Sequence, residues 1–124
     1  MARARSASLT DGEARLMAVL WQKQKATVSD VVTSLKGRRP VNYSTVQTML
    51  RILEDKGYVA HDKAGRAFVY RPVVSQPQAR RKALSHLMTR LFDNSPSLLV
   101  LNVLEHEQID PAELERLKKL IEKA

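Results

Sequence analysis

The segment from residue 42 to 57 constrains the fold more than any other, because it carries two helix-end signals and two separate faces. Asn42 is a favoured N-cap residue and Gly57 stands where a left-handed C-cap residue is needed, so residues 43–56 are predicted to form a helix. At 100° per residue, its apolar and polar side chains fall on opposite sides. The apolar side consists of Val46, Met49, Leu50 and Leu53. It predicts packing against neighbouring helices.

Two helices are signalled before this segment. Thr10 and Thr27 are each followed three residues later by a carboxylate, the pattern of a capping box, which predicts helices over residues 11–24 and 28–36. The spacing of apolar residues assigns the buried positions. These are Ala14, Met17, Leu20 and Trp21 in the first helix, and Val28, Val31, Val32 and Leu35 in the second.

A hairpin and further helices follow. Residues 58–61 and 67–70 are rich in β-branched and aromatic residues, so they are predicted to be strands joined by a basic tip over 62–66. Ser75 precedes a predicted helix over 76–92, and Ser95 and Asp110 each precede a proline at a first helical position.

This order of elements predicts a mainly α fold with a small β-hairpin. The expected domains are an N-terminal winged helix-turn-helix domain over residues 1–74, with a flexible basic arm over 1–8, and a C-terminal helical dimerisation region over 75–124.

The positive charge is concentrated in the first part of the chain. The net charge is +8, with 13 Lys/Arg against 6 Asp/Glu in residues 1–74 and 8 against 7 in the remainder. Such a local field favours an anionic partner, nucleic acid first and a membrane surface second. The chain has no cysteine, no apolar run long enough to cross a bilayer and no apolar stretch after its first arginines. We therefore expect a cytoplasmic protein that is not inserted in a membrane.

The polar side of the 43–56 helix suits a DNA major groove. Ser44, Gln47, Thr48 and Arg51 lie within about 60° of one another. Short hydroxyls can approach another surface closely, and Gln and Arg match the edges of adenine and guanine. In a winged helix-turn-helix domain the third helix enters the groove and the wing meets the DNA backbone.

The same residues carry a resemblance. The stretches LTDGEARLMAVLW, TVSDVVTSL, VNYSTVQTMLRILEDKGYV and FVYRPVVS, and the C-terminal SLLVLNVLEHEQIDPAELERLKKLIEKA, resemble the penicillinase-repressor family of bacterial transcription regulators, of the BlaI/MecI/CopY type. The resemblance implies a homodimeric repressor of a palindromic operator. It places Ser44, Thr45, Gln47, Thr48 and Arg51 at the bases and Tyr43 near a phosphate.

The resemblance also implies a route of regulation. In β-lactam-responsive members, a membrane sensor protease pathway inactivates the repressor by cleavage within the C-terminal region, after an Asn that aligns with Asn102. The resemblance thus implies relief of repression here by β-lactam or cell-wall stress. Here Val103 follows, where those members commonly have Phe. Copper-responsive members carry a C-terminal cysteine cluster, which this chain lacks.

Two further sets of residues are assigned from charge and periodicity. Basic residues outside the recognition helix are candidates for phosphate contacts: Arg3, Arg5, Arg38, Arg39, Lys63 and Arg66. Apolar stripes in the last 50 residues exceed what three short helices can bury on themselves, so a symmetric dimer is expected to cover them. They comprise Leu84, Leu87, Met88, Leu91, Phe92, Leu98, Leu101, Val103, Leu104, Leu114, Leu117, Leu120 and Ile121.

Enzymatic chemistry and cofactors are not expected. The three histidines are far apart in sequence and lack the spacing of a metal pair, and the four glycines form no phosphate-binding loop. Two alternatives to this repressor remain open: a winged-helix repressor of another family controlled by a small ligand, and a winged-helix module that binds a protein.

Overall fold

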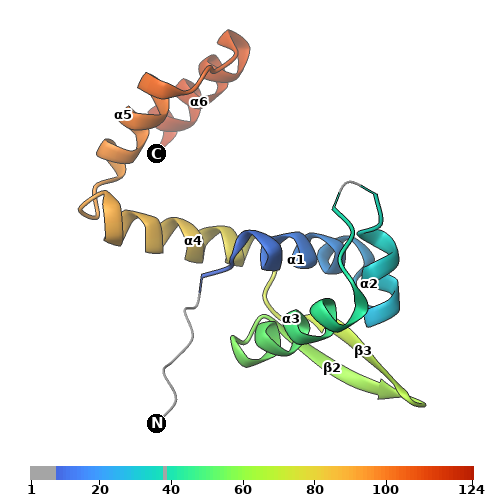
Figure 1. The fold of residues 1–124 in the computed structure, drawn as a ribbon. Helices are drawn as coiled ribbons and strands as arrows, with labels where there is room; N and C mark the ends of the chain where they lie inside the picture. Colours follow the sequence, from blue (N-terminus) through green and yellow to red (C-terminus); the bar gives the residue numbers. More distant parts are fainter. Residues whose placement is uncertain (1–7, 38) are drawn as a thin grey trace. The chain divides into compact units, whose positions relative to one another are not determined.

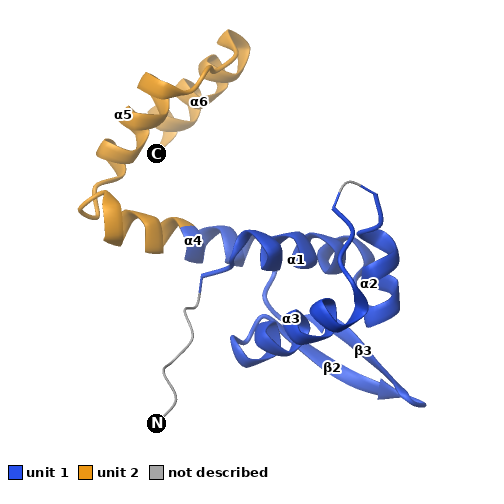
Figure 2. Cartoon of the chain, viewed as in Figure 1, with its two compact units in different colours: residues 1–83 blue, residues 84–124 orange. Residues whose placement is uncertain are grey.

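The computed structural model describes residues 8–37 and 39–124, and its elements follow the predicted order (Figure 1). They are α1 (Asp11–Lys23), β1 (Ala26–Thr27), α2 (Val28–Ser34), α3 (Tyr43–Asp55), β2 (Val59–Ala64), β3 (Ala67–Pro72), α4 (Gln76–Leu91), α5 (Pro96–His106) and α6 (Pro111–Lys123). The chain forms two compact units that meet between Ala83 and Leu84, inside α4, rather than at residue 74 (Figure 2).

The helices of the first unit begin where their capping residues predict. Thr10 and Glu13 form a reciprocal box, in which the Glu13 amide donates to Thr10 Oγ1 at 3.2 Å and the Thr10 amide donates to Glu13 Oε1 at 2.8 Å. Thr27 and Asp30 repeat this arrangement at 3.1 and 3.0 Å. Each box satisfies two backbone groups that would otherwise lack helical partners.

The core of the first unit joins all three helices to the sheet. It includes Leu16, Met17, Leu20, Val31, Val46, Leu50, Leu53, Tyr58, Val59 and Tyr70. The apolar side predicted for α3 is confirmed, with Met49 only partly buried. The prediction for Ala14 is wrong, because the buried face of α1 is centred near Glu13 and Leu20, and Ala14 lies about 100° from Glu13. Trp21 and Val32 pack at the edge of the core.

The hairpin is longer and its turn tighter than predicted. The strands form an antiparallel sheet in the order β1-β3-β2, and Ala64 pairs with Ala67, which leaves only Gly65 and Arg66 in the turn. Gly65 has a φ of +63°, a conformation that tight hairpin turns need and that glycine adopts freely. The predicted tip over residues 62–66 is therefore mostly strand. The two-residue β1 was not predicted, because it is too short to show a period.

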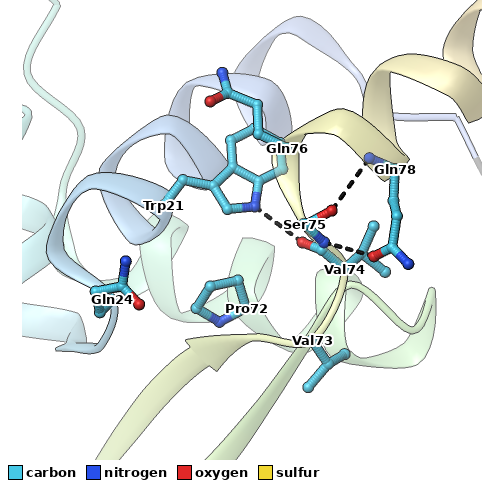
Figure 3. A pocket seen from close by; sticks show the side chains of 8 residues that line it. All are labelled: Trp21, Gln24, Pro72, Val73, Val74, Ser75, Gln76 and Gln78. Carbon is cyan, nitrogen blue, oxygen red and sulfur yellow. Dashed lines mark hydrogen bonds between the residues drawn. The ribbon is translucent and has the colours of Figure 1, made fainter.

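The start of α4 belongs to the first unit. The Trp21 indole N–H donates to the Val74 carbonyl at 2.9 Å, and Ser75 and Gln78 cap the helix reciprocally (Figure 3). Ala79 is buried, and the Lys82 ammonium lies 5.1 Å from the centre of the Tyr58 ring. These contacts fix the first two turns of α4 on the winged helix.

A buried ion pair ties α1 to the end of α3. Lys56 Nζ lies 2.7 Å from Glu13 Oε1 and donates to the Ser8 carbonyl at 3.0 Å, and the two charged side chains are only 6% and 5% exposed. Burial alone would raise the pKa of Glu13, but hydrogen bonds from Lys56 and the Thr10 backbone outweigh it, so the pKa lies below its ordinary value of 4.5.

We predict that breaking this pair is costly and that removing both charges is not. Lys56→Met leaves a buried carboxylate without its cation and should lower the free energy of unfolding by about 3–5 kcal/mol, measured by urea denaturation. The double variant Glu13→Gln/Lys56→Met keeps the capping box without charge and should recover most of the loss. Lys36→Met, at an exposed position, is the charge-matched control.

The pair also sets a pH dependence. Because the folded-state pKa of Glu13 is lowered, its stabilisation is complete above about pH 4.5 and is lost as the pH falls through the folded-state value. The double variant should lose less stability than the wild type on acidification. Equal losses in the two proteins would contradict this account of Glu13.

A third prediction concerns the domain boundary. A chain ending at Ala83 should be more stable than one ending at Val74 by about 1–2 kcal/mol, because the shorter chain loses the Ala79 burial and the Lys82–Tyr58 contact. Thermal unfolding, with the full chain as reference, should show a difference of several degrees. Identical midpoints would place the boundary before α4.

Candidate nucleic-acid interface

The polar side of α3 faces solvent in the structure. Burial of Val46, Leu50 and Leu53 turns the opposite side of the helix outward. Of the predicted base-facing residues, Ser44, Thr45, Thr48 and Arg51 are exposed, whereas Gln47 is half-buried. All five belong to one helix and can meet one partner surface together.

Hydrogen bonds fix the first turn of this helix. The Asn42 side-chain oxygen accepts the Thr45 backbone N–H at 2.9 Å and the Ser44 hydroxyl at 3.0 Å. Tyr43, at the first helical position, is 51% exposed. The N-terminal end of α3 thus presents short polar side chains and a phenol on an ordered backbone.

The wing adds two exposed cations. Lys63 lies near the end of β2 and Arg66 in the turn that follows. Arg71 also lies on the sheet, but its guanidinium is 3.0 Å from the Asp62 carboxylate. Lys63 and Arg66 are therefore better placed than Arg71 to meet an anion.

Helix α3 and the wing converge around Tyr70. Burial raises the pKa of the Tyr70 hydroxyl, the Glu54 carboxylate nearby raises it further, and Arg51 opposes this. Glu54 Oε1 also lies 2.7 Å from His61 Nδ1, and the His61 ring stacks on Phe68 with centroids 4.3 Å apart. This link between α3 and the wing was not predicted from the sequence. The predicted first strand ends at His61, so no cross-strand partner was expected for this histidine, whereas β2 continues to Ala64.

The remaining predicted phosphate contacts are only partly described. Arg39 is exposed in the segment before α3. Arg3, Arg5 and Arg38 lie outside the described residues, so their predicted contacts stay predictions. Among the described residues, the candidate phosphate-binding cations outside α3 are Arg39, Lys63 and Arg66.

The second unit exposes the predicted apolar stripes. No residue of α5 or α6 is buried, and the exposed set includes Leu84, Leu87, Leu91, Leu98, Leu101, Val103, Leu104, Leu117, Leu120 and Ile121. Met88, Phe92 and Leu114 are partly buried. Asn102 and Val103 lie within α5, where the Asn102 side-chain amide donates to the Leu98 carbonyl at 3.0 Å.

The first unit also contains a pocket of about 460 Å³ at the junction of α1, β3 and α4 (Figure 3). Trp21, Pro72, Val73 and Val74 supply its apolar lining, and Gln24, Ser75, Gln76 and Gln78 its polar lining. No charged side chain among the described residues lines this pocket.

Over residues 8–37 and 39–124, no group of three or more His, Asp or Glu could hold a metal ion. In the same residues, no helix is long and apolar enough to span a membrane.

Three helices followed by a two-stranded wing, with the polar side of the third helix exposed, define a winged-helix protein. The family model described as penicillinase repressor matches residues 9–123. The chain therefore belongs to the penicillinase repressor family, as its sequence motifs indicate. This excludes the alternative of a repressor from another winged-helix family.

Similar proteins agree with this assignment. The chain is 29% identical over 114 residues to the penicillinase repressor of Bacillus licheniformis, covering 92% of this chain and 89% of that protein. The solution structure of the DNA-binding domain of the repressor BlaI has 30% identity and a TM-score of 0.53, covering 61% of this chain and 93% of that one. The solution structure of the monomeric form of B. licheniformis BlaI in complex with the blaP half-operator has 32% identity and a TM-score of 0.50, covering 57% of this chain and 87% of that one.

Proposed function

We propose that this protein is a transcriptional repressor that binds operator DNA through α3 and the β2–β3 wing. The observation that carries the proposal is the outward polar side of α3, with Arg51 on it and two exposed cations on the adjacent wing. The half-operator complex of BlaI supports it, because that repressor is similar in fold and sequence. The protein acts in the cytoplasm, where the operator is.

Each residue set has a distinct part in this proposal. Ser44, Thr45, Gln47, Thr48 and Arg51 face the bases, with hydroxyls and amides supplying donors and acceptors and Arg51 matching a guanine edge. Tyr43, Arg39, Lys63 and Arg66 contact phosphates and set the register of the protein on the duplex. Gln47 is half-buried and exposes only part of its side chain to the groove, whereas Arg51 is exposed. We therefore expect Arg51 to contribute more to specificity than Gln47.

We predict that Arg51→Ala relaxes sequence preference. Losing a guanidinium at a base edge should weaken operator binding by about 1–3 kcal/mol while changing binding to random duplex much less, measured by fluorescence anisotropy at fixed salt. Arg39→Ala removes the same charge away from α3 and should weaken both duplexes similarly. An equal loss on both duplexes with Arg51→Ala would contradict its base-reading role.

The second unit completes the proposal as a homodimerisation region. Its apolar side chains are exposed in a single chain, and a second copy presents the same face to them, so a two-fold arrangement buries both at once. A dimer reads two half-sites of a palindrome, which supplies the selectivity that one winged helix lacks.

Dimerisation can be tested on α6. Leu117 and Leu120 are exposed and lie on one side of this helix, while Lys118 points away from them. Leu117→Gln/Leu120→Gln should give a monomer in sedimentation and a large loss of affinity for a full operator, with little loss for a half-site. Lys118→Gln should remain dimeric. A double variant that stays dimeric would exclude α6 from the interface.

We propose that repression is relieved by cleavage within this second unit. Cleavage of Asn102–Val103, by a pathway that starts at a membrane sensor and responds to β-lactam or cell-wall stress, would separate α6 from the rest of the chain and release DNA by mass action. The bond lies inside α5 with Asn102 bonded to the preceding turn, so cleavage requires local opening of the helix.

The alternative of a protein-binding module makes a different prediction. Binding through Lys63, Arg66 and Arg39 to DNA releases counterions and depends steeply on salt. Binding of a protein partner without such dependence, together with no measurable affinity for duplex DNA, would favour the module.

A further inference from the structure

The last turn of α3 makes a polar contact with the wing. Glu54 lies one turn beyond Arg51, and its carboxylate accepts a hydrogen bond from His61 Nδ1 at 2.7 Å. Both side chains are about one-third exposed, so the contact lies at the edge of the core and not inside it. By itself such a partly exposed pair contributes little to overall stability.

The strand register extends this contact toward the wing tip. His61 pairs with Tyr70 and Lys63 pairs with Phe68, and residues opposite each other or two apart share one face of a sheet. His61, Lys63, Phe68 and Tyr70 therefore lie on a single face. Because Tyr70 is buried in the core and His61 contacts Glu54, this face is the one directed toward α3.

Ring contacts connect the core to the tip on this face. The Tyr70 ring is buried, the His61 ring lies 5.5 Å from it and stacks on Phe68 at 4.3 Å with an interplanar angle of 25°, and Phe68 is 42% exposed. The ion pair between Asp62 and Arg71 lies on the opposite face, where it joins the two strands to each other and not to α3. The Glu54–His61–Phe68 contacts thus connect α3 to the outer half of the wing.

We infer that Glu54, His61 and Phe68 are positioning residues that hold the wing at a fixed angle to α3, so that Lys63 and Arg66 reach phosphates while α3 reads the bases. This inference rests on the proposed DNA-binding function. None of the three residues needs to touch DNA itself. A wing that swings freely would lose entropy on binding or miss its phosphates altogether.

The test is a double-variant cycle on operator duplex. Lys63→Gln/Arg66→Gln removes the two proposed phosphate contacts and should lower the salt slope by about 1.8 per half-site. His61→Ala leaves both cations in place, yet should lower the slope by a similar amount and the affinity about tenfold, because the wing is no longer held. Combining His61→Ala with Lys63→Gln/Arg66→Gln should cost less than a further twofold.

Phe68→Ala serves as a second, uncharged variant at an exposed site and should behave like His61→Ala. Asp62→Asn/Arg71→Gln removes the ion pair on the other face without changing the net charge, and should leave the salt slope unchanged. Circular dichroism melting confirms that each variant is folded at the assay temperature.

The outcomes distinguish failure of the positioning role from failure of DNA binding. If wild-type protein binds operator with a steep salt slope but the losses from His61→Ala and Lys63→Gln/Arg66→Gln multiply, the positioning role is wrong while the proposed function stands. If His61→Ala lowers affinity without changing the slope, the histidine acts only through stability and the inference also fails. Absence of salt-dependent DNA binding by the wild type would overturn the proposed function itself.

Discussion

The burial of Val46, Leu50 and Leu53 is the constraint on which the rest of the first unit depends. All three are fully excluded from solvent, and they lie on one side of α3 against α1 and α2. An apolar stripe of this kind fixes the rotation of a helix about its own axis, because any large turn would expose it. Burial of this apolar stripe therefore holds the polar side of α3 toward solvent.

Polar contacts then fix the two ends of α3. At the start of α3, Asn42 orders the first turn through the Thr45 amide and the Ser44 hydroxyl. At its end, Lys56 enters the core to meet Glu13. Because replacing a buried ion pair with apolar side chains is often neutral or stabilising, the pair is better understood as fixing where α3 ends relative to α1 than as a source of stability.

Local rules predicted most of the fold, whereas contacts between distant residues were missed. Thr10, Thr27, Asn42 and Ser95 mark helix starts through neighbours three residues away, which is information that a single segment contains. Glu13 and Lys56 are 43 residues apart, so the sequence indicated only the capping role of Glu13. The hairpin turn was placed too broadly, because Asp62–Arg66 contains several turn-forming and charged residues, and only pairing shows that the ladder continues to Ala64.

The same distinction holds for the site. Periodicity alone placed Ser44, Thr48 and Arg51 on an exposed side of α3, and the structure agrees. The connection of the wing to α3 through His61 depends on strand register, which the sequence did not specify. In the second unit the apolar stripes were predictable, but what covers them depends on a second molecule.

Selection of duplex DNA from a random pool by the whole chain of 124 residues, followed by sequencing, tests directly whether a symmetric dimer reads DNA through α3. We expect an inverted repeat whose half-site centres are about one helical turn, or a whole number of turns, apart, since each α3 of a symmetric dimer enters a major groove on one side of the duplex. Recovery of an unrepeated motif would contradict the symmetric dimer, and recovery of no enriched sequence would contradict base reading by α3.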